Sequence, residues 1–599
     1  MSSSANTNSS GFSVRAWVGD TKTLLAFDMP QQQAKRLGGF TIQCQPQGKS
    51  PYYLFNNLAF EHPEQHAHDP AQPSNTSLNA PFQKFRWLHV PGSMHQGIDP
   101  FRGPYTYVVT PRYFDAQGSL QPLDQSQSVS VQVDVVPFKT KQVQLAFTRG
   151  YQQSQAFVRH FGNKAQIRPK GKELLFDTSQ VAGTSADGTT YTYADEYRWQ
   201  GFTARELVFD VLNQVLGDEK LHLDVFAYDL NEPDVLKIFL ELAKQGRIRV
   251  ILDNASLHHV AKPPLKNEDQ FEQAFKDVAQ GDAAILRGKF GRFAHDKILV
   301  VSDPNGPIRV LTGSTNFAVT GLYVNSNHVL SFTDPKVTGT YQQLFDDVWK
   351  GKVAENAFLA SPLASGAVSV DTAETPPTDF TFSPHSKENA TEILGAIAAR
   401  IQEEGTKEGG SVLFAVMQMD RGESPVFTAL TNLHSNQSIF SYGVSDSPGG
   451  IELYDPGKAT GVLVTGKPTA TKLPPPFNQV PGVAGHQIHH KFVVCGFNRD
   501  DATVYCGSSN LALGGEQLNG DNLLAIQDPD IATAFAIEAV SLVDHFQFLD
   551  RFSKPQAPAP VSLRETAKEA GAFLATDDSW TSKYFDPKDL HFLDRQLFA

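Results

Sequence analysis

The sequence is poor in cysteine and has no long apolar run, and each shortage excludes a class of protein. Three cysteines in 599 residues are too few for a disulfide framework, and an odd number leaves at least one thiol free. No stretch reaches the roughly 18 apolar residues of a membrane span. The opening MSSSANTNSSGFSVRAW lacks the basic start and apolar run of a secretion signal. We therefore expect a cytoplasmic protein, with export by a leaderless route left open.

Positive charge is also scarce. The 51 Lys and Arg residues are outnumbered by 64 Asp and Glu residues, so the formal net charge is -13. This balance excludes the generally basic surface that a non-specific nucleic-acid binder needs, although it allows a local basic pocket. Hydrophobic residues make up 40% and charged residues 19%, which is the composition of a globular protein. A chain of this length is expected to form several domains.

Hydrophobic patterning predicts three domains. In residues 1–140, alternating runs such as GGFTIQCQ and VSVQVDVVPF are broken at short intervals by Pro, Gly and Asn, which predicts a β-sandwich of fibronectin or immunoglobulin type. From residue 141 strands alternate with helices, which predicts an α/β domain over 141–365. A stretch rich in Pro, Ser, Thr and Ala at about 355–385 is typical of a linker, and a second α/β domain is expected over 366–599.

The two predicted α/β domains repeat one pattern. In the first, Thr203 is expected to cap a helix that ends near Leu216, and LHLDVFAYDL (221–230) reads as a buried strand. In the second, SVLFAVMQM (411–419) takes the place of that strand. The chain therefore contains a diverged internal duplication.

The duplication carries a shared set of polar residues. Nineteen residues separate His295 from Ser314 and also His489 from Ser508. In both copies a further asparagine lies nine residues after the asparagine of a Gly-Ser-x-Asn segment. The first copy consists of His295, Lys297, Gly313, Ser314, Asn316, Asn325 and Asn327. The second consists of His489, Lys491, Gly507, Ser508, Asn510, Asn519 and Asp521.

Strand geometry predicts what these residues do. Each His-x-Lys opens an apolar β-run, and residues i and i+2 of a strand point to the same face, so imidazole and ammonium are expected in one cavity. The glycine of each Gly-Ser pair lets backbone approach closely, while Ser and Asn side chains can donate hydrogen bonds to a phosphate oxygen. A third triplet, His385-Ser386-Lys387, lies in a polar stretch without the downstream serine, and we predict that it lies on the surface.

The paired segments resemble the HxKxxxxD and GSxN motifs of the phospholipase D superfamily, and the resemblance extends from about residue 145 to residue 599. It implies two α/β halves related by a pseudo-two-fold axis and a phosphodiesterase that needs no metal or cofactor. The first 140 residues resemble, less specifically, an accessory domain of uncharacterised bacterial members. The motif aspartate is replaced by Ser302 in the first copy and by Gly496 in the second, as in the tyrosyl-DNA phosphodiesterases of the superfamily.

The resemblance also implies a division of roles. One imidazole attacks phosphorus to form a phosphohistidine, and the other protonates the leaving oxygen and later activates water. The catalytic set is expected to be His295, Lys297, His489, Lys491, Asn316, Asn510 and Asp521. The substrate-binding set is expected to be Ser314, Ser508, Asn325, Asn327, Asn519, Gly313 and Gly507.

Superfamily members imply that the distal acid position of one half supports the histidine of the other. On that basis Asp521 supports His295 as the nucleophile, and Asn327 supports His489 as the acid. A carboxylate raises the basicity of the imidazole that it contacts, whereas an amide does so weakly.

The substrate class stays open at this point. A phospholipid head group is the leading hypothesis, with peripheral membrane contact, and a nuclease and a catalytically silent binding module are the alternatives. With both copies in one chain, oligomerisation is not required for the active site. A zinc cluster of His486, His489 and His490 is disfavoured because no carboxylate or cysteine lies at ligand spacing. The aromatic-rich end from Trp580 to Phe598 is expected to pack in the core rather than to line a lipid-binding mouth.

Overall fold

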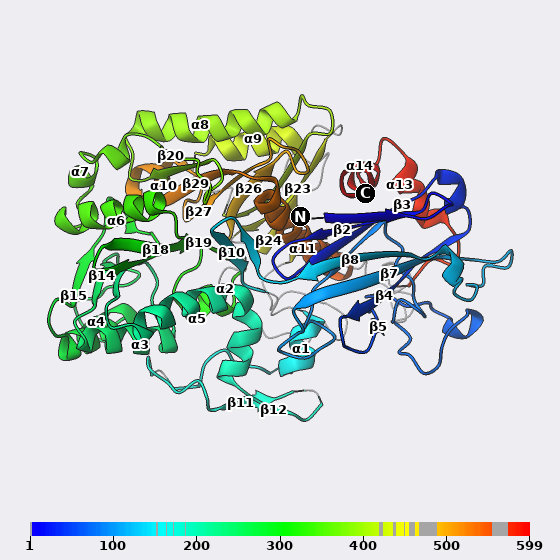
Figure 1. Ribbon diagram of the computed structural model, residues 1–599, viewed down its shortest axis with the longest axis horizontal. Helices are drawn as coiled ribbons and strands as arrows, with labels where there is room; N and C mark the ends of the chain where they lie inside the picture. The colour runs from blue at the N-terminus through cyan, green and yellow to red at the C-terminus, as the bar shows by residue number, and fades with distance from the viewer. Residues whose placement is uncertain are drawn as a thin grey trace, which may run out of the picture.

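The computed structural model places most of the described chain in four large β-sheets and the helices that cover them (Figure 1). It describes residues 3–150, 154–162, 164–171, 173–185, 187–418, 423–434, 439–447, 450–454, 462–465, 488–553 and 573–599. None of the described helices combines the length and the hydropathy that crossing a bilayer requires.

The N-terminal part forms two antiparallel sheets of four strands, coloured blue in Figure 1. One contains β1 (Ser3–Thr7), β2 (Ser13–Val18), β3 (Thr23–Asp28) and β6 (Arg86–His89). The other contains β5 (Tyr52–Tyr53), β4 (Leu37–Pro46), β7 (Gly103–Tyr113) and β8 (Val129–Val135). Buried side chains of both sheets, including Val14, Phe27, Phe40 and Val131, share one hydrophobic core. Alternate residues of β8 are buried and exposed, as the period-2 pattern predicts.

The third sheet is mixed and has eight strands. Across the sheet these are β15 (Ala284–Gly288), β14 (Ile248–Asp253), β13 (His222–Ala227), β17 (Ile298–Asp303), β18 (Gly306–Gly313), β19 (His328–Phe332), β10 (Val143–Phe147) and β9 (Phe138–Thr140). Strands β13, β14 and β15 are parallel, and the other pairs are antiparallel. The parallel pairs are joined by α3 (Pro233–Lys244) and α4 (Asn267–Val278), as crossover connections require.

The fourth sheet has nine strands and repeats this order. It runs β20 (Val368–Val370), β21 (Thr378–Phe382), β29 (Asn522–Gln527), β27 (Thr503–Gly507), β26 (Lys491–Cys495), β22 (Ser411–Met417), β23 (Phe440–Ser447), β24 (Gly450–Tyr454) and β25 (Val462–Thr465). Strand β22 is parallel to β23 and antiparallel to β26, just as β13 is to β14 and β17. The described chain is therefore a mixed α/β structure with several sheets, in which the two largest sheets share a strand order.

A helical segment from Thr203 to Gly217 is present, as predicted, but the predicted cap at Thr203 and the predicted linker at 355–385 were wrong. The helix assigned to Thr203 belongs to α2 (Tyr193–Gly217), which begins earlier because Thr192 caps it through the backbone N–H of Asp195. Thr203 follows a break in α2 at Phe202, and its hydroxyl binds Asp20 instead of capping. The stretch at 355–385 is not a linker, since it contains β20 and β21, and β21 pairs along its length with β29.

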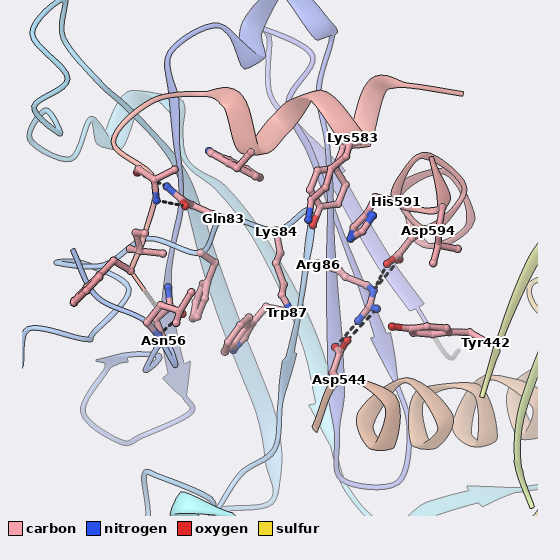
Figure 2. Close-up of a pocket in the computed structure, with 18 of the residues that line it drawn as sticks. Asn56, Gln83, Lys84, Arg86, Trp87, Tyr442, Asp544, Lys583, His591 and Asp594 are labelled. Carbon is pink, nitrogen blue, oxygen red and sulfur yellow. Dashed lines mark hydrogen bonds and ion pairs between the residues drawn. The ribbon is translucent and has the colours of Figure 1, made fainter. Parts of the chain in front are cut away.

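The C-terminal residues lie beside the N-terminal sheets (Figure 1). Arg86 of β6 donates to Asp594 of α14 (Leu590–Phe598) at 2.7 Å and to Asp544 of α11 (Pro529–Ser553) at 2.5 Å, as Figure 2 shows. Trp580 and Phe585 pack against the N-terminal core, and Phe598 is fully buried. The prediction of core packing for this aromatic segment is confirmed for these residues.

One hydrophobic cluster joins all of these parts. It contains Trp17 of β2, Phe147 of β10, Phe492 of β26 and Phe535 of α11. Helix α11 contacts strands of the N-terminal and the nine-stranded sheets, and it lies near the centre of the view in Figure 1. The cluster holds the ends of β17, β18, β26 and β27, which carry the paired polar residues, in fixed relative positions.

Candidate functional site

Each Gly-Ser pair stands where a strand approaches its neighbour unusually closely. Gly313 has φ +145°, and a Cβ there would lie 2.4 Å from the carbonyl oxygen of His328. Gly507 has φ +138°, and its Cβ would lie 2.4 Å from the carbonyl oxygen of Asn522. Only glycine fits both positions, because a side chain would meet backbone in an unfavourable conformation. Each glycine thus lets the serine that follows it lie against the next strand: Ser314 contacts His328 of β19, and Ser508 contacts Asn522 of β29.

The backbone before each His-x-Lys pairs with the opposite copy. The N–H of His295 donates to the carbonyl of Gly520 at 2.9 Å, within a short parallel pairing of β16 (Phe293–Ala294) and β28 (Asn519–Gly520). The N–H of His489 donates to the carbonyl of Ser326 at 3.1 Å, beside a bridge between Ser326 and Ile488. The backbone position of each histidine is therefore fixed by residues that follow the Gly-Ser-x-Asn segment of the other copy.

The two histidines bind side chains across the same junction. The Nδ1 atom of His295 lies 2.6 Å from Oδ1 of Asp521, which also accepts from the Ser508 hydroxyl at 2.8 Å. The Nδ1 atom of His489 lies 2.8 Å from Oδ1 of Asn327, which also accepts from the Ser314 hydroxyl at 2.8 Å. Nδ1 of each ring is bound in this way, and Nζ of Lys491 also lies 3.3 Å from Nδ1 and 3.4 Å from Nε2 of His489.

The two lysines are buried beside their histidines. Lys297 donates to the carbonyl of His295 and stands over the ring of Tyr228, with Nζ 4.9 Å from the ring centre. Lys491 donates to the carbonyl of His489 at 2.8 Å. Burial lowers the pKa of Lys297 to about 8, against the opposing charge of Asp521. Burial also lowers the pKa of Lys491 well below its usual range, and the nearby Lys297 ammonium adds to this effect. The ammonium groups of the two copies thus act on one another.

Charge around His295 favours a neutral ring. Burial lowers the pKa of His295 to about 4, although Asp521 opposes the change, and both lysines lower the pKa further. Burial raises the pKa of Asp521, but His295, Lys297 and the Ser508 hydroxyl together outweigh burial, so its pKa lies below the usual range. The pair is therefore a neutral imidazole and a carboxylate near neutral pH.

The asparagines of the two copies are also in the site region, where all are buried except Asn510, which is partly buried. The Oδ1 atoms of Asn316 and Asn510 have no hydrogen-bond partner among the described residues. Asn519 donates to Oδ2 of Asp521 at 3.1 Å and accepts from Arg292 at 2.9 Å. The carbonyl of Asn325 accepts from the Thr148 hydroxyl at 2.7 Å. The fourteen predicted residues thus lie in the two crossed segments, and the side chain of Asn519 contacts the residue that binds His295.

Several residues beside the histidines were not singled out from sequence. His328 and Asn522, which directly follow the distal positions, bond to Ser314 and Ser508 through their backbone N–H groups. The middle residue of each His-x-Lys also crosses between copies, since Asn522 donates to Asp296 at 2.7 Å and His490 lies 3.2 Å from His328. The sequence did contain a signal for these residues, because His328 and Asn522, like Asp296 and His490, occupy the same position in the two copies.

One group of possible metal ligands lies near Tyr228. Asp229, His258 and Glu268 each offer a ligand atom, and the three atoms lie within 4.8 Å of one another. The ring of Tyr228 meets those of both His258 and His295 edge to face. Sequence spacing missed this group because its members come from three separate segments.

The third His-x-Lys triplet is only partly at the surface: Ser386 and Lys387 are exposed, as predicted, but His385 is buried, so the prediction was wrong for the histidine. His385 is 2% exposed, and its Nδ1 donates to the carbonyl of Ala364 at 2.8 Å. It precedes α8 (Lys387–Glu404) and bonds through its N–H to the carbonyl of Glu516, away from the crossed pair of histidines. His486, considered above for zinc, lies outside the described residues.

Comparison with known proteins identifies part of the chain. Residues 214–349 match the family model of the phospholipase D-like domain of cardiolipin synthase. A curated relative from Chlamydomonas reinhardtii, named mitochondrial cardiolipin hydrolase, is 28% identical over 135 residues. The match covers 22% of this chain, and the chain spans about half of that relative's length, 54%.

Solved structures with partial similarity include three kinds of protein. Polyphosphate kinase from Porphyromonas gingivalis has a TM-score of 0.36 at 13% identity, over 61% of this chain and 53% of that chain. Nuc from Salmonella typhimurium, a phospholipase D family member, has a TM-score of 0.20 at 20% identity, over 24% and 87%. A yeast tyrosyl-DNA phosphodiesterase mutant has a TM-score of 0.29 at 10% identity, over 53% and 86%.

The matched domain contains the first His-x-Lys and Gly-Ser-x-Asn segments, whose hydrogen bonds are repeated by the second pair. On this basis residues 214–349 contain a phospholipase D-like domain.

Proposed function

We propose that the protein is a phosphodiesterase that acts without a metal ion through a phosphohistidine, at one site made by both His-x-Lys segments. The observation that carries this proposal is the pair of crossed hydrogen bonds, His295 to Asp521 and His489 to Asn327. On this proposal Nε2 of each ring faces one phosphodiester, with Lys491 beside Nε2 of His489. On this interpretation residues 141–365 and 366–599 form two halves related by a pseudo-two-fold axis, and residues 1–140 form an accessory β-sandwich.

The reaction needs a nucleophile, a proton donor and positive charge. The Nε2 lone pair of His295 forms a bond to phosphorus while the bond from phosphorus to the leaving oxygen breaks, and His489 donates its proton to that oxygen. Water then attacks the phosphohistidine, the phosphorus–nitrogen bond breaks, and His489 takes the proton from water. Lys297 and Lys491 stabilise the charge on the non-bridging oxygens.

Hydrogen-bonding groups assist the lysines. The Nδ2 groups of Asn316 and Asn510 can donate to a phosphate oxygen, whereas their Oδ1 atoms, which have no partner among the described residues, can only accept. Ser314, Ser508 and Asn519 hold the partners of the histidines in place, and Asn325 accepts from Thr148 through its backbone carbonyl. Because the groups that face phosphorus are cations and amides, the transition state is stabilised by fixed charges and dipoles of the protein itself.

We further propose a phospholipid head group as the substrate class. Its support is the name of the Chlamydomonas relative, a cardiolipin hydrolase, together with the net charge of -13, which disfavours a long polyanionic nucleic acid. Contact with a membrane surface would be peripheral, and both copies of the motif are supplied by one chain.

The experiment compares substrates in the presence of a chelator. The purified full chain is incubated with EDTA and either phospholipid vesicles containing cardiolipin, phosphatidylcholine or phosphatidylethanolamine, or single-stranded DNA. Release of phosphatidate, choline or ethanolamine that is lost in both His295→Ala and His489→Ala supports the proposal. DNA cleavage that is lost in both histidine variants would show that the substrate is a nucleic acid and not a phospholipid. Activity that disappears only with EDTA would contradict the metal-free mechanism and direct attention to Asp229, His258 and Glu268.

A further inference from the structure

A second group of polar side chains lies where the parallel strands of the eight-stranded sheet end. Strand β13 is followed by Tyr228 and Asp229, β14 ends at Asp253, and Glu268 stands in the first turn of α4. The carboxyl ends of parallel strands are the usual place for a ligand in an α/β sheet. Within the part of the chain that the structure describes, Asp229, His258 and Glu268 offer three possible metal-ligand atoms, all within 4.8 Å of one another.

The negative charge of this group is not neutralised by a neighbouring cation. Neither Asp229 nor Glu268 forms an ion pair with a lysine or arginine of the described residues, and the charges of Arg168 and Lys297 act on Asp229 only from a distance. Glu268 is 3% exposed, whereas Asp229 is partly exposed and gives the group an opening to solvent. Two carboxylates packed this closely need either a shared proton or a bound cation.

The imidazole of the group is oriented as a metal ligand is. Nδ1 of His258 lies 2.9 Å from Oδ2 of Asp253, and Nε2, the nitrogen left for an ion, has no hydrogen-bond partner among the described residues. His258 is 7% exposed and Asp253 is fully buried. A histidine that binds a metal usually donates its other ring N–H to a carboxylate, which fixes the ring and raises the basicity of the ligating nitrogen.

The partners of these side chains hold them in place without an ion. Oε1 of Glu268 accepts from the N–H of Leu230 at 3.1 Å, and Oδ1 of Asp229 accepts from Nδ2 of Asn231 at 3.0 Å. The second oxygen of each carboxylate has no N–H or hydroxyl donor among the described residues. Two metal–ligand bonds of about 2.2 Å span at most about 4.4 Å, so small side-chain rotations bring both carboxylates and His258 to one ion.

The ligand types select the kind of ion. Carboxylate oxygens together with an imidazole nitrogen suit first-row divalent cations such as Zn²⁺ and Mn²⁺, whereas Mg²⁺ and Ca²⁺ prefer oxygen ligands alone. We propose that Asp229, His258 and Glu268 bind one first-row divalent cation, which joins the segment after β13, the loop after β14 and the start of α4. This inference goes beyond the proposed function, because no step of that reaction uses the ion.

The cation site lies next to the proposed active site. The ring of Tyr228 contacts those of His258 and His295, with ring centres 4.3 and 4.5 Å apart. Asp253, which binds His258, also accepts from the N–H of Ala294, the residue before His295, at 2.7 Å. A bound ion therefore stabilises the segment that carries Tyr228, and its role is structural.

The test measures binding of Zn²⁺ to the full chain. The protein is stripped with EDTA, freed of the chelator and dialysed against Zn²⁺ with Mg²⁺ in excess, and bound zinc is counted by elemental mass spectrometry. We expect one Zn²⁺ per chain in wild type and an affinity lower by about tenfold or more in His258→Asn and Glu268→Gln. His258→Asn keeps an N–H for Asp253 and removes Nε2. Displacement of Zn²⁺ by Mg²⁺ would overturn the assignment to a first-row cation.

His259→Asn is the matched control. His259 is the next residue in the chain, and its Nδ1 also lies close to a carboxylate oxygen, 2.7 Å from Oδ1 of Asp269, but it is not one of the three ligands. It should bind Zn²⁺ as wild type does. Unchanged binding in both His258→Asn and Glu268→Gln, or an equal loss in His259→Asn, overturns the proposal. A wild-type chain that binds no Zn²⁺ also overturns it and leaves the two carboxylates sharing a proton.

Two further measurements keep the test decisive if a variant does not fold. X-ray absorption of the zinc-loaded wild type should show one imidazole nitrogen and oxygen ligands at about 2.0–2.2 Å, and sulfur or several imidazoles would contradict the assignment. Zn²⁺ should also raise the unfolding temperature of wild type and of His259→Asn by the same amount, because it binds only the folded chain, and raise that of the two ligand variants less.

Turnover measured in EDTA and again with Zn²⁺ restored separates this site from the proposed function. A structural ion predicts hydrolysis in both conditions. Zinc binding at these residues without any phosphodiesterase activity would defeat the proposed function and leave the cation site standing. Hydrolysis in both conditions by a chain that binds no zinc would do the reverse.

Discussion

The two histidines occupy matching positions but differ in the group behind them. His295 is backed by the carboxylate of Asp521, and His489 by the amide of Asn327, at 2.6 and 2.8 Å. Behind the carboxylate, Asn522 and Asp296 complete the contacts, whereas behind the amide a pair of histidines leads to Glu538 and Lys22. A carboxylate supports a basic nucleophile, and an amide leaves the ring a better proton donor. Two segments with the same spacing of polar residues can therefore hold two histidines in unlike surroundings.

The largest effect is expected from removing the nucleophile. His295→Ala should lower kcat by roughly 10⁴-fold or more, as losses of catalytic nucleophiles do. Acid-stable and acid-labile phosphate adducts are separated after a quench and mapped by peptide mass spectrometry, which should locate the label on His295 in wild type. His385→Ala, which removes a buried histidine of a His-x-Lys triplet outside the site, serves as the control and should keep near wild-type turnover. Label on His489 in wild type would reverse the assignment.

Exchanging the groups that bind Nδ1 of the two histidines should change which histidine acts as the nucleophile. Asp521→Asn leaves both rings backed by amides and is expected to lower kcat by about 10²–10⁴-fold, because neither ring is then a good nucleophile. The double variant Asp521→Asn with Asn327→Asp should recover part of the loss and move the phosphate label to His489. Peptide mapping of the trapped intermediate checks this result. A double variant that still labels His295 would show that the backing group does not choose the nucleophile.

The dependence of kcat/KM on pH tests the charge states of His295 and Lys297. The pKa of His295 is lowered to about 4, so this ring is a free nucleophile above that pH and is lost to protonation below it. The pKa of Lys297 is lowered to about 8, so its ammonium is present below that pH and is lost above it. We expect kcat/KM to be flat between these values and to fall on both sides. In Asp521→Asn the acid limb should move to lower pH, because the carboxylate that raises the pKa of His295 is gone.

The smallest effects concern the glycines that position the two serines. Gly313→Ala and Gly507→Ala should each lower stability by about 1–3 kcal/mol, because both residues have positive φ and face a carbonyl oxygen. Gly395→Ala is the matched control, since it lies in α8 with nothing within 4 Å of its Cβ, and it should raise stability by about 0.5–1 kcal/mol. Denaturant unfolding of the three variants gives the comparison. Similar losses in the free energy of unfolding for Gly313→Ala and Gly507→Ala would agree with equal roles of the two glycines.

Much of the site could be predicted from local patterns. The spacing from histidine to serine recurs in both copies, and strand alternation predicted one face for His295 and Lys297, although both residues lie between β16 and β17. The strand runs of the N-terminal part appear as β3, β4, β6, β7 and β8. Where prediction failed, a distant partner was responsible. Thr203 binds Asp20 instead of capping a helix, and the stretch at 355–385 forms strands because β29 offers an edge.

The sequence by itself determined which residue types recur, their spacing and the faces of the strands on which they stand, because these depend on neighbours within a few residues. Tertiary structure decided which carboxylate or amide meets which imidazole. His295 and Asp521 are 226 residues apart, and Lys22 and Glu538 are 516 apart, so no local rule connects them. The shared core brings these segments together, and once they are buried each polar group must find a partner or lose the hydrogen bonds that it made with water.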